Sequence, residues 1–191
     1  MMPLPATSYV PQNAPAEGAG RRAALAWLAA SAVAVSGVGL IFAAPLLAAS
    51  GRGWAALVIY RAFAGFCHQQ AERSFSLDGH ALAVCARCTG IYAGFAACAL
   101  LYPLARGLRR VDAPARRWLL LALLPTALDF ALNFVGLWSN THASRALTGA
   151  IAGAGAAFFA LPGLVDFGRS FGRRAGPVSF ARESGAGELR A

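Results

Sequence analysis

The feature that most constrains this chain is an uncharged apolar run from Ala23 to Ala49. Its 27 residues exceed the roughly 20 that an α-helix needs to cross a bilayer. A cleavable signal peptide has a shorter apolar core, of about 7–15 residues, so we expect this run to be retained as a first spanning helix. Composition agrees, because 58% of the residues are hydrophobic and only 13% are charged, too few to cover a soluble globular surface.

Similar apolar runs predict three further spanning helices, over residues 89–105, 118–137 and 147–165. Residues 54–66 are apolar but too short to cross a bilayer and contain Arg61, which favours an interfacial helix. We therefore predict an all-α integral membrane protein with four transmembrane helices, a short interfacial helix and a Cys-containing hairpin loop.

The predicted membrane domain covers residues 23–166 and includes a Cys/His loop at residues 67–88. Residues 1–22 hold four of the ten prolines and few apolar side chains, which predicts a disordered N-terminal tail. Residues 167–191 are polar and basic and are predicted to form a disordered C-terminal tail.

The basic residues predict the orientation, and all 17 of them are arginines. Five arginines fall in the 106–117 loop, whereas the 138–146 loop holds only Arg145. We therefore expect both termini in the cytoplasm of a prokaryote, with the protein in its cytoplasmic membrane and the Cys/His loop facing outward. If residues 54–66 spanned the membrane instead, the N-terminus would lie outside. The net charge of +9 is expected to meet anionic lipid at the cytoplasmic face, not nucleic acid, whose binding proteins are rarely so apolar.

Three of the four cysteines lie in the predicted outward loop, Cys67 alone and Cys85 and Cys88 as a Cys-x-x-Cys pair. The dipeptide Asp78-Gly79 between apolar residues predicts a tight hairpin that brings the lone cysteine toward the pair. Cysteines at this spacing can both bind one tetrahedral zinc ion.

The sequence thus predicts a zinc site with the three cysteines and His68 as ligands. Because adjacent residues such as Cys67 and His68 tend to point apart, His142 is an alternative fourth ligand. Thr89 follows the pair, so the Cys-x-x-Cys-His form of haem attachment is excluded. Cys98 lies inside the second predicted span and is expected to be an inert packing residue.

Two alternatives to the metal site stay open. Thiols on the outer side of a bacterial membrane tend to pair, so a Cys67–Cys85 or a Cys85–Cys88 disulfide is one of them. The other is a membrane thiol–disulfide carrier that uses the Cys-x-x-Cys pair.

Asp129 lies within the third predicted span, where an acid costs roughly 2.5–3.5 kcal/mol on insertion scales. We expect it to face the bundle interior and to have a partner, for which Arg145 is one candidate. Asn140 and His142 follow in the next loop, on the same side as the cysteines. These four residues are expected to line a polar pocket beside the metal.

A metal-assisted hydrolase is the enzymatic hypothesis for this pocket, although the sequence leaves open whether the chain is an enzyme. Metal-bound water would be the nucleophile, Asp129 or His142 the base, and Arg145 the group that holds an anion. A third hypothesis is a small transporter component in which Asp129 carries a proton or cation, although no internal repeat supports it.

Several motifs together closely resemble a prokaryotic membrane-protein family catalogued as domain of unknown function 2085. They are Cys67-His68-Gln69, Arg73-Ser74-Phe75 and Cys85-Ala86-Arg87-Cys88-Thr89-Gly90-Ile91-Tyr92-Ala93-Gly94, followed by Pro125, Asp129, Asn140, Arg145 and Thr148-Gly149. Family members usually have glycine after the aspartate and glutamine one turn later, where this chain has Phe130 and Asn133. The resemblance covers about residues 55–160. It implies a multi-spanning membrane protein and no particular chemistry.

Overall fold

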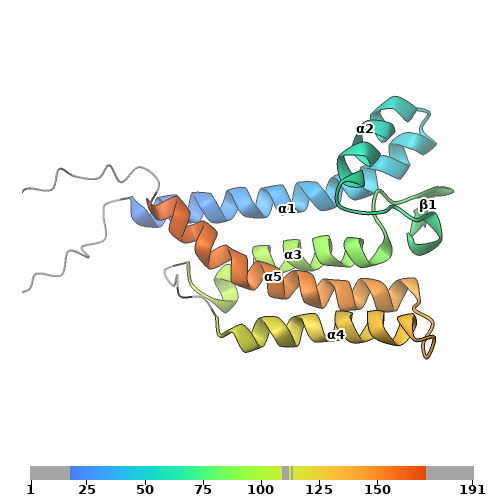
Figure 1. The fold of residues 1–191 in the computed structure, drawn as a ribbon. Coiled ribbons are helices and arrows are strands. Elements are labelled where there is room, and N and C mark those ends of the chain that lie inside the picture. Colours follow the sequence, from blue (N-terminus) through green and yellow to red (C-terminus); the bar gives the residue numbers. More distant parts are fainter. Residues whose placement is uncertain (1–17, 109–111, 113, 171–191) are drawn as a thin grey trace, which may run out of the picture.

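The computed structural model describes residues 18–108, 112 and 114–170. Most of each predicted tail, residues 1–22 and residues 167–191, therefore lies outside the described residues. Four long helices run side by side, and a shorter helix and a small hairpin gather at one end of them (Figure 1). The long helices are α1 (Ala19–Ala49), α3 (Ala86–Ala105), α4 (Arg116–Phe134) and α5 (His142–Ser170). All four are long and apolar enough to cross a membrane, as the apolar runs predict.

The short helix α2 (Gly53–Ala64) has 12 residues, too few to cross a bilayer at 1.5 Å of rise per residue. It follows α1 through a turn and lies beside the end of that helix (Figure 1). The start of α3, the end of α4 and the start of α5 lie at this same end of the bundle. The Cys/His loop and the loop between α4 and α5, which are predicted to face the same side of the membrane, therefore lie at the same end of the bundle.

The four long helices begin two to five residues before the predicted spans, because helices continue past the apolar core of a span. The helix α4 ends at Phe134, three residues before the predicted end, because the left-handed Gly136 (φ 74°) follows its C-cap Val135. The helix α5 starts at His142, five residues before the predicted boundary, since Thr141 caps it. The Thr141 hydroxyl accepts the Ser144 N–H at 3.0 Å, and the Ser144 hydroxyl accepts the Thr141 N–H at 3.1 Å. This reciprocal pair satisfies two backbone donors at a helix start. Residues 167–170, predicted to belong to the tail, extend α5.

The hairpin pairs β1 (Ser76–Leu77) with β2 (His80–Ala81) in antiparallel register. Asp78 and Gly79 form its two-residue turn, with φ of 50° and 79°. Positive φ at both central positions is what a type I′ turn requires. The hairpin predicted from the Asp-Gly dipeptide is thus confirmed.

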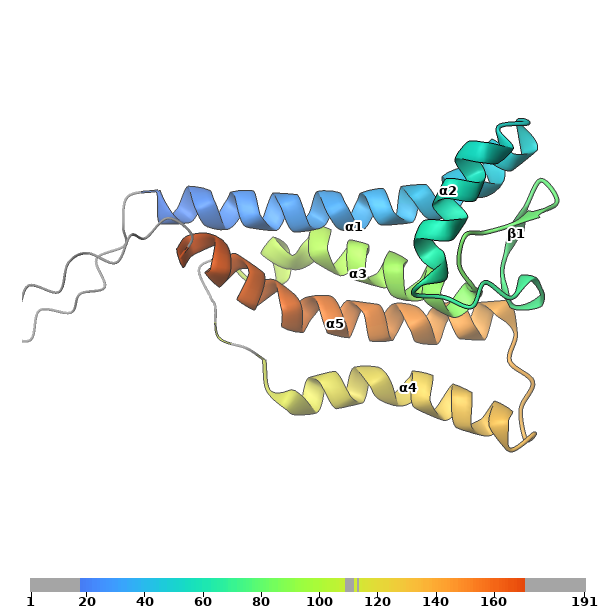
Figure 2. The ribbon, with the colours of Figure 1, turned by 45° about the horizontal axis from the view of Figure 1, so that its top comes forward.

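Helices α3 and α5 make the closest contact in the bundle. A Cβ placed on Gly90 would lie 2.0 Å from the Ala146 carbonyl oxygen, and one on Gly94 would lie 2.1 Å from that of Ala150. Backbones approach this closely only where side chains are absent, as at helix contacts in lipid. Figure 2 shows α1 and α4 on opposite sides of this central pair.

The outer helices expose large apolar side chains instead of burying them. In α4 Leu120 is 68% exposed, and in α1 Val33 is 74% exposed. An apolar surface of this extent would be an aggregation hazard in water and is normal against lipid.

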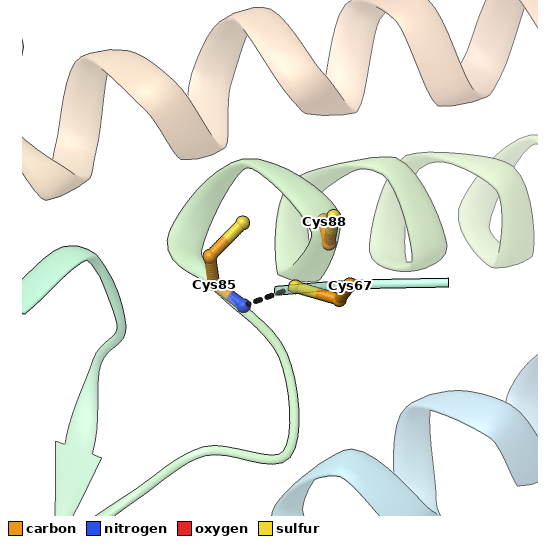
Figure 3. A group of neighbouring side chains, drawn as sticks. All are labelled: Cys67, Cys85 and Cys88. Atoms are coloured by element: carbon orange, nitrogen blue, oxygen red, sulfur yellow. Dashed lines mark hydrogen bonds between the residues drawn. The ribbon is translucent and has the colours of Figure 1, made fainter. Parts of the chain in front are cut away.

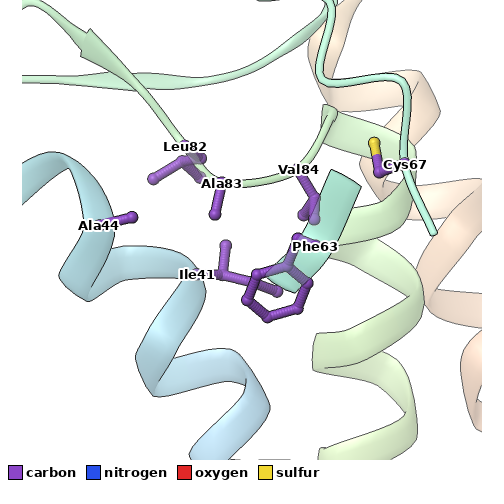
Figure 4. Packing of buried hydrophobic residues seen from close by; sticks show 7 residues of the cluster. All are labelled: Ile41, Ala44, Phe63, Cys67, Leu82, Ala83 and Val84. Atoms are coloured by element: carbon purple, nitrogen blue, oxygen red, sulfur yellow. The ribbon is translucent and has the colours of Figure 1, made fainter. Parts of the chain in front are cut away.

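A buried cluster at the hairpin end joins α1, α2 and the segment before α3 (Figure 4). It consists of the following side chains: Ile41, Ala44, Phe63, Cys67, Leu82, Ala83 and Val84. Its burial fixes the chain on both sides of the cysteines, because residues 63–67 and 82–84 are held against the same face of α1.

Candidate metal centre

Three sulfur atoms meet at the start of α3. The Sγ atoms of Cys67, Cys85 and Cys88 all lie within 4.8 Å of one another (Figure 3). Sulfurs that share a tetrahedral zinc at about 2.3 Å lie about 3.8 Å apart. The group, called here the thiol cluster, would thus need to close by about 1 Å or less to hold such an ion.

The helix start brings the Cys-x-x-Cys pair to one side. Cys85 occupies the N-cap position of α3, and Cys88 lies in the first turn. Residues three positions apart in the first turn lie close together on the helix surface, and the chain that leaves α2 passes beside them (Figure 3). That chain supplies Cys67, which is buried with 7% of its surface exposed.

Backbone N–H groups point at the Cys67 sulfur. It accepts a hydrogen bond from the Cys85 N–H at 3.2 Å, drawn in Figure 3, and another from the Gln69 N–H at 3.4 Å. Such N–H groups hold the sulfur in place and suit a metal-bound thiolate. A thiolate is the form that binds metal.

The cluster also lowers the pKa of the Cys85 thiol, to about 5. The main cause is the hydrogen bond from the Cys88 thiol, aided by the Cys88 and Arg87 N–H groups and the Cys67 thiol, while burial acts in the opposite direction. The Cys85 thiol therefore loses its proton more readily than a free cysteine does.

Gln69 holds the loop that carries Cys67. Its backbone has a φ of 51°, a left-handed conformation that is uncommon for a residue with a side chain. Its Nε2 donates to the Tyr60 carbonyl and to the Ala83 carbonyl, each at 2.7 Å. The Tyr60 hydroxyl in turn donates to the Ala81 carbonyl at 2.6 Å. The sequence alone predicts no role for Gln69, and the one signal for it is its place in the motif Cys67-His68-Gln69.

The histidines are not part of the thiol cluster. His68 is exposed and lines the neighbouring pocket, and among the described residues no imidazole nitrogen joins the three sulfurs. His142 lies elsewhere, with Nε2 3.1 Å from the Glu72 carbonyl oxygen and its ring 5.6 Å from that of Phe75. These two contacts hold the start of α5 against the Cys/His loop.

Asp129 is buried, as expected of an acid in a spanning helix, and its ion-pair partner is Arg87 at 2.5 Å. Asn140 donates to the same carboxylate oxygen at 2.8 Å and to the Asp129 carbonyl at 3.1 Å. The Arg87 guanidinium also lies over the Phe130 ring, 5.9 Å from its centre. The ion pair therefore joins the start of α3, beside the thiols, to α4.

A pocket of about 390 Å³ opens beside the thiol cluster. Its lining combines the three cysteines with three arginines, four amides, two phenylalanines and one histidine: Phe66, Cys67, His68, Gln69, Gln70, Arg73, Cys85, Arg87, Cys88, Phe130, Asn133, Asn140 and Arg145. Among the residues predicted to line a polar pocket, Asn140 and Arg145 do so. Asp129 contacts the pocket through Arg87, and His142 lies outside the lining.

Apolar helices of spanning length, with a thiol cluster and a polar pocket at one end, define a multi-pass membrane protein. The family described as "Predicted membrane protein (DUF2085)" matches residues 67–159. An uncharacterized protein of Methanocaldococcus jannaschii is 36% identical over 127 residues, which cover 64% of this chain and 81% of the relative. The chain therefore belongs to this family, and the resemblance seen in its motifs is confirmed.

A second relative, an uncharacterized protein of Methanothermobacter thermautotrophicus, is 40% identical over 97 residues, which cover 50% of this chain and 84% of the relative. No solved structure matches the chain at a significant level. The family match begins at Cys67 and ends within α5. It therefore includes the whole thiol cluster and the Arg87–Asp129 pair, whereas α1 and α2 precede it.

Proposed function

We propose that this membrane protein binds a zinc ion through the thiolates of Cys67, Cys85 and Cys88. The observation that carries the proposal is the mutual approach of three sulfurs to within 4.8 Å, from two segments separated by a hairpin. The N–H groups directed at Cys67 support it, because they stabilise the charge that metal binding requires.

Zinc that is held by three protein ligands keeps a fourth position for water or substrate. Among the described residues, no histidine or carboxylate ligand atom joins the three sulfurs. The adjoining pocket therefore suits a metal-assisted hydrolase, in which water adds across the scissile bond of an anionic substrate. In this proposal Arg145 binds the anion, and Asp129 positions Arg87. His142 holds the start of α5 against the Cys/His loop at the edge of the pocket.

Metal content per chain tests the zinc proposal. We expect about one zinc per chain by elemental mass spectrometry on detergent-purified protein, and loss of the zinc in Cys85→Ser. Cys98→Ser is the matched control, because Cys98 lies on α3 outside the thiol cluster. Wild-type protein without metal, or Cys85→Ser protein that retains it, would contradict the proposal.

A thiol–disulfide carrier is the second candidate, and one observation favours it. Cys85 occupies the N-cap position of α3, has a lowered pKa and is followed three residues later by Cys88, an arrangement typical of redox-active pairs. This candidate expects Cys85 and Cys88 to cycle between dithiol and disulfide in cells, which trapping with an alkylating reagent would detect. A pair that stays fully reduced in oxidising conditions would exclude it.

A further inference from the structure

The pocket beside the thiol cluster carries more positive than negative charge. Arg73, Arg87 and Arg145 all line it, and Arg87 is paired with Asp129. Neither Arg73 nor Arg145 has an acidic partner within the described part of the chain. A zinc ion bound to three thiolates would add one negative charge, so the net charge around the pocket would still be positive.

Two of these arginines have unused hydrogen-bonding capacity in the interior. The Nε atoms of Arg87 and Arg145 are buried and have no partner among the described residues. A buried donor without an acceptor costs free energy, which the arginine recovers if its guanidinium turns toward a bound anion. Both side chains line the pocket, so an anion placed there is within their range.

Arg87 is positioned before any ligand arrives. Asp129 holds its guanidinium at 2.5 Å, the Phe130 ring lies beneath it, and Asn140 fixes the carboxylate in turn. Restraint of this kind lowers the entropy lost on binding, because the guanidinium needs no further ordering. Asp129 and Asn140 are thus positioning residues for a cationic site.

The number of guanidinium groups favours phosphate over carboxylate. A guanidinium matches either anion with two parallel hydrogen bonds. A carboxylate has two oxygens to share, whereas a phosphate ester has three strong acceptor oxygens and a charge of about −1.5 to −2. Three arginines around one pocket are therefore better used by a phosphate.

The pocket also has room for the organic part of the ligand and apolar walls to receive it. Its volume of about 390 Å³ falls within the roughly 300–1,000 Å³ typical of small-molecule sites. Phe66 and Phe130 contribute apolar lining, and Phe66 is 79% exposed at the end of the bundle. A phosphate at the arginines could thus carry an apolar group along the phenylalanines.

We propose that this pocket binds the phosphate group of an organic ligand through Arg73, Arg87 and Arg145. The inference rests on the proposed function in placing that group beside a zinc ion, and it names the substrate class for the same site. The phosphate can belong to a lipid headgroup or to a small soluble compound, since both present the same oxygens.

Calorimetry on purified protein in a phosphate-free maltoside detergent tests the proposal. The titrants are inorganic phosphate, dioctanoyl phosphatidic acid in mixed micelles and, as the carboxylate comparison, succinate. We expect Arg145→Gln to weaken phosphate binding about tenfold or more, the loss typical of one charge-assisted contact. Arg73→Gln is expected to weaken binding as well, and it should fold, because Arg73 is exposed at the end of the short 3-10 helix η1 (Ala71–Arg73). Arg61→Gln is the control, because Arg61 is exposed on α2 and outside the pocket lining.

The outcomes separate the two proposals and the two ligand sources. Binding of phosphatidic acid alone identifies a lipid headgroup, and equal binding of inorganic phosphate identifies a soluble ligand; both support the phosphate site. No binding of either compound, equal affinities for Arg145→Gln and Arg61→Gln, or succinate bound as tightly as phosphate would overturn it. Zinc content is measured on the same samples, so arginine-dependent phosphate binding without zinc would reject the metal and retain the phosphate site.

Discussion

At the residue scale, the geometry of the thiol cluster depends on a side chain that is not a ligand. Gln69 bridges the Tyr60 and Ala83 carbonyls with its amide, and its N–H donates to the Cys67 sulfur. The two carbonyls belong to the chain segments on either side of the hairpin. Gln69 therefore fixes the distance between Cys67 and the Cys-x-x-Cys pair.

We expect Gln69→Ala to lower the free energy of unfolding by about 2 kcal/mol, because two amide hydrogen bonds of about 1 kcal/mol each are lost. The Gln69→Ala variant is also expected to lose its zinc to a chelator faster than the wild-type protein does. Thermal unfolding in detergent and a chelator competition measure the two effects. Gln70→Ala is the control, since the Gln70 side chain makes no hydrogen bond within the described residues. Equal unfolding and zinc loss in both variants would show that the Gln69 amide is dispensable.

At the element scale, the bundle is organised around the contact between α3 and α5. Glycines on both helices allow it, since a Cβ on Gly94 would lie 2.1 Å from the Ala150 carbonyl oxygen and one on Gly153 would lie 2.1 Å from that of Ile91. The same contact places Arg87, at the start of α3, beside the start of α5, where Arg145 lies. The pocket thus depends on how closely these two helices approach.

We expect Gly94→Ala to separate the helices and to destabilise the protein by about 1–3 kcal/mol, the usual cost of overpacking. Gly163→Ala is the matched control, because a Cβ on Gly163 in α5 meets nothing within 4 Å. That substitution is expected to be neutral or slightly stabilising, since alanine favours a helix interior. Melting temperatures of the two variants in the same detergent make the comparison, and equal melting would refute the close approach of α3 and α5.

At the scale of the whole molecule, two candidate spans, α3 and α4, separate the two loops of the pocket, so we propose that both loops lie on one side of the membrane. The helix α2 is too short to cross, so the described chain has four candidate spans. The end of α3 and the start of α4, between which the sequence holds five arginines at positions 106–117, lie at the opposite end of the bundle from the thiol cluster (Figure 1). We propose that this arginine-rich end is cytoplasmic.

Reporter fusions in bacterial cells test that orientation. We expect green fluorescent protein fused after Ala191 to fluoresce, and alkaline phosphatase fused after Trp138 to be active, because the first reporter works only in the cytoplasm and the second only outside it. Active phosphatase at the C-terminus would reverse the orientation. The thiol cluster would then face a reducing compartment, where a disulfide is disfavoured.

The spans and the hairpin follow from the sequence alone because their signals are local. Hydropathy over a window of helix length decides whether a segment can enter lipid. The Asp78-Gly79 turn decides the strand register, because its positive φ values are a property of two adjacent residues. The family motifs, too, are contiguous enough to be found without any structure.

The partners within the site were decided only by the tertiary structure. Asp129 pairs with Arg87, 42 positions away, and not with Arg145, since the relative placement of α3, α4 and α5 decides which guanidinium reaches the carboxylate. Cys67 meets the Cys-x-x-Cys pair while His68 turns outward, because the left-handed backbone at Gln69 and the buried cluster around Phe63 orient that loop. Hydropathy determines which segments lie in the membrane, but side-chain shape and hydrogen bonding determine how they face one another there.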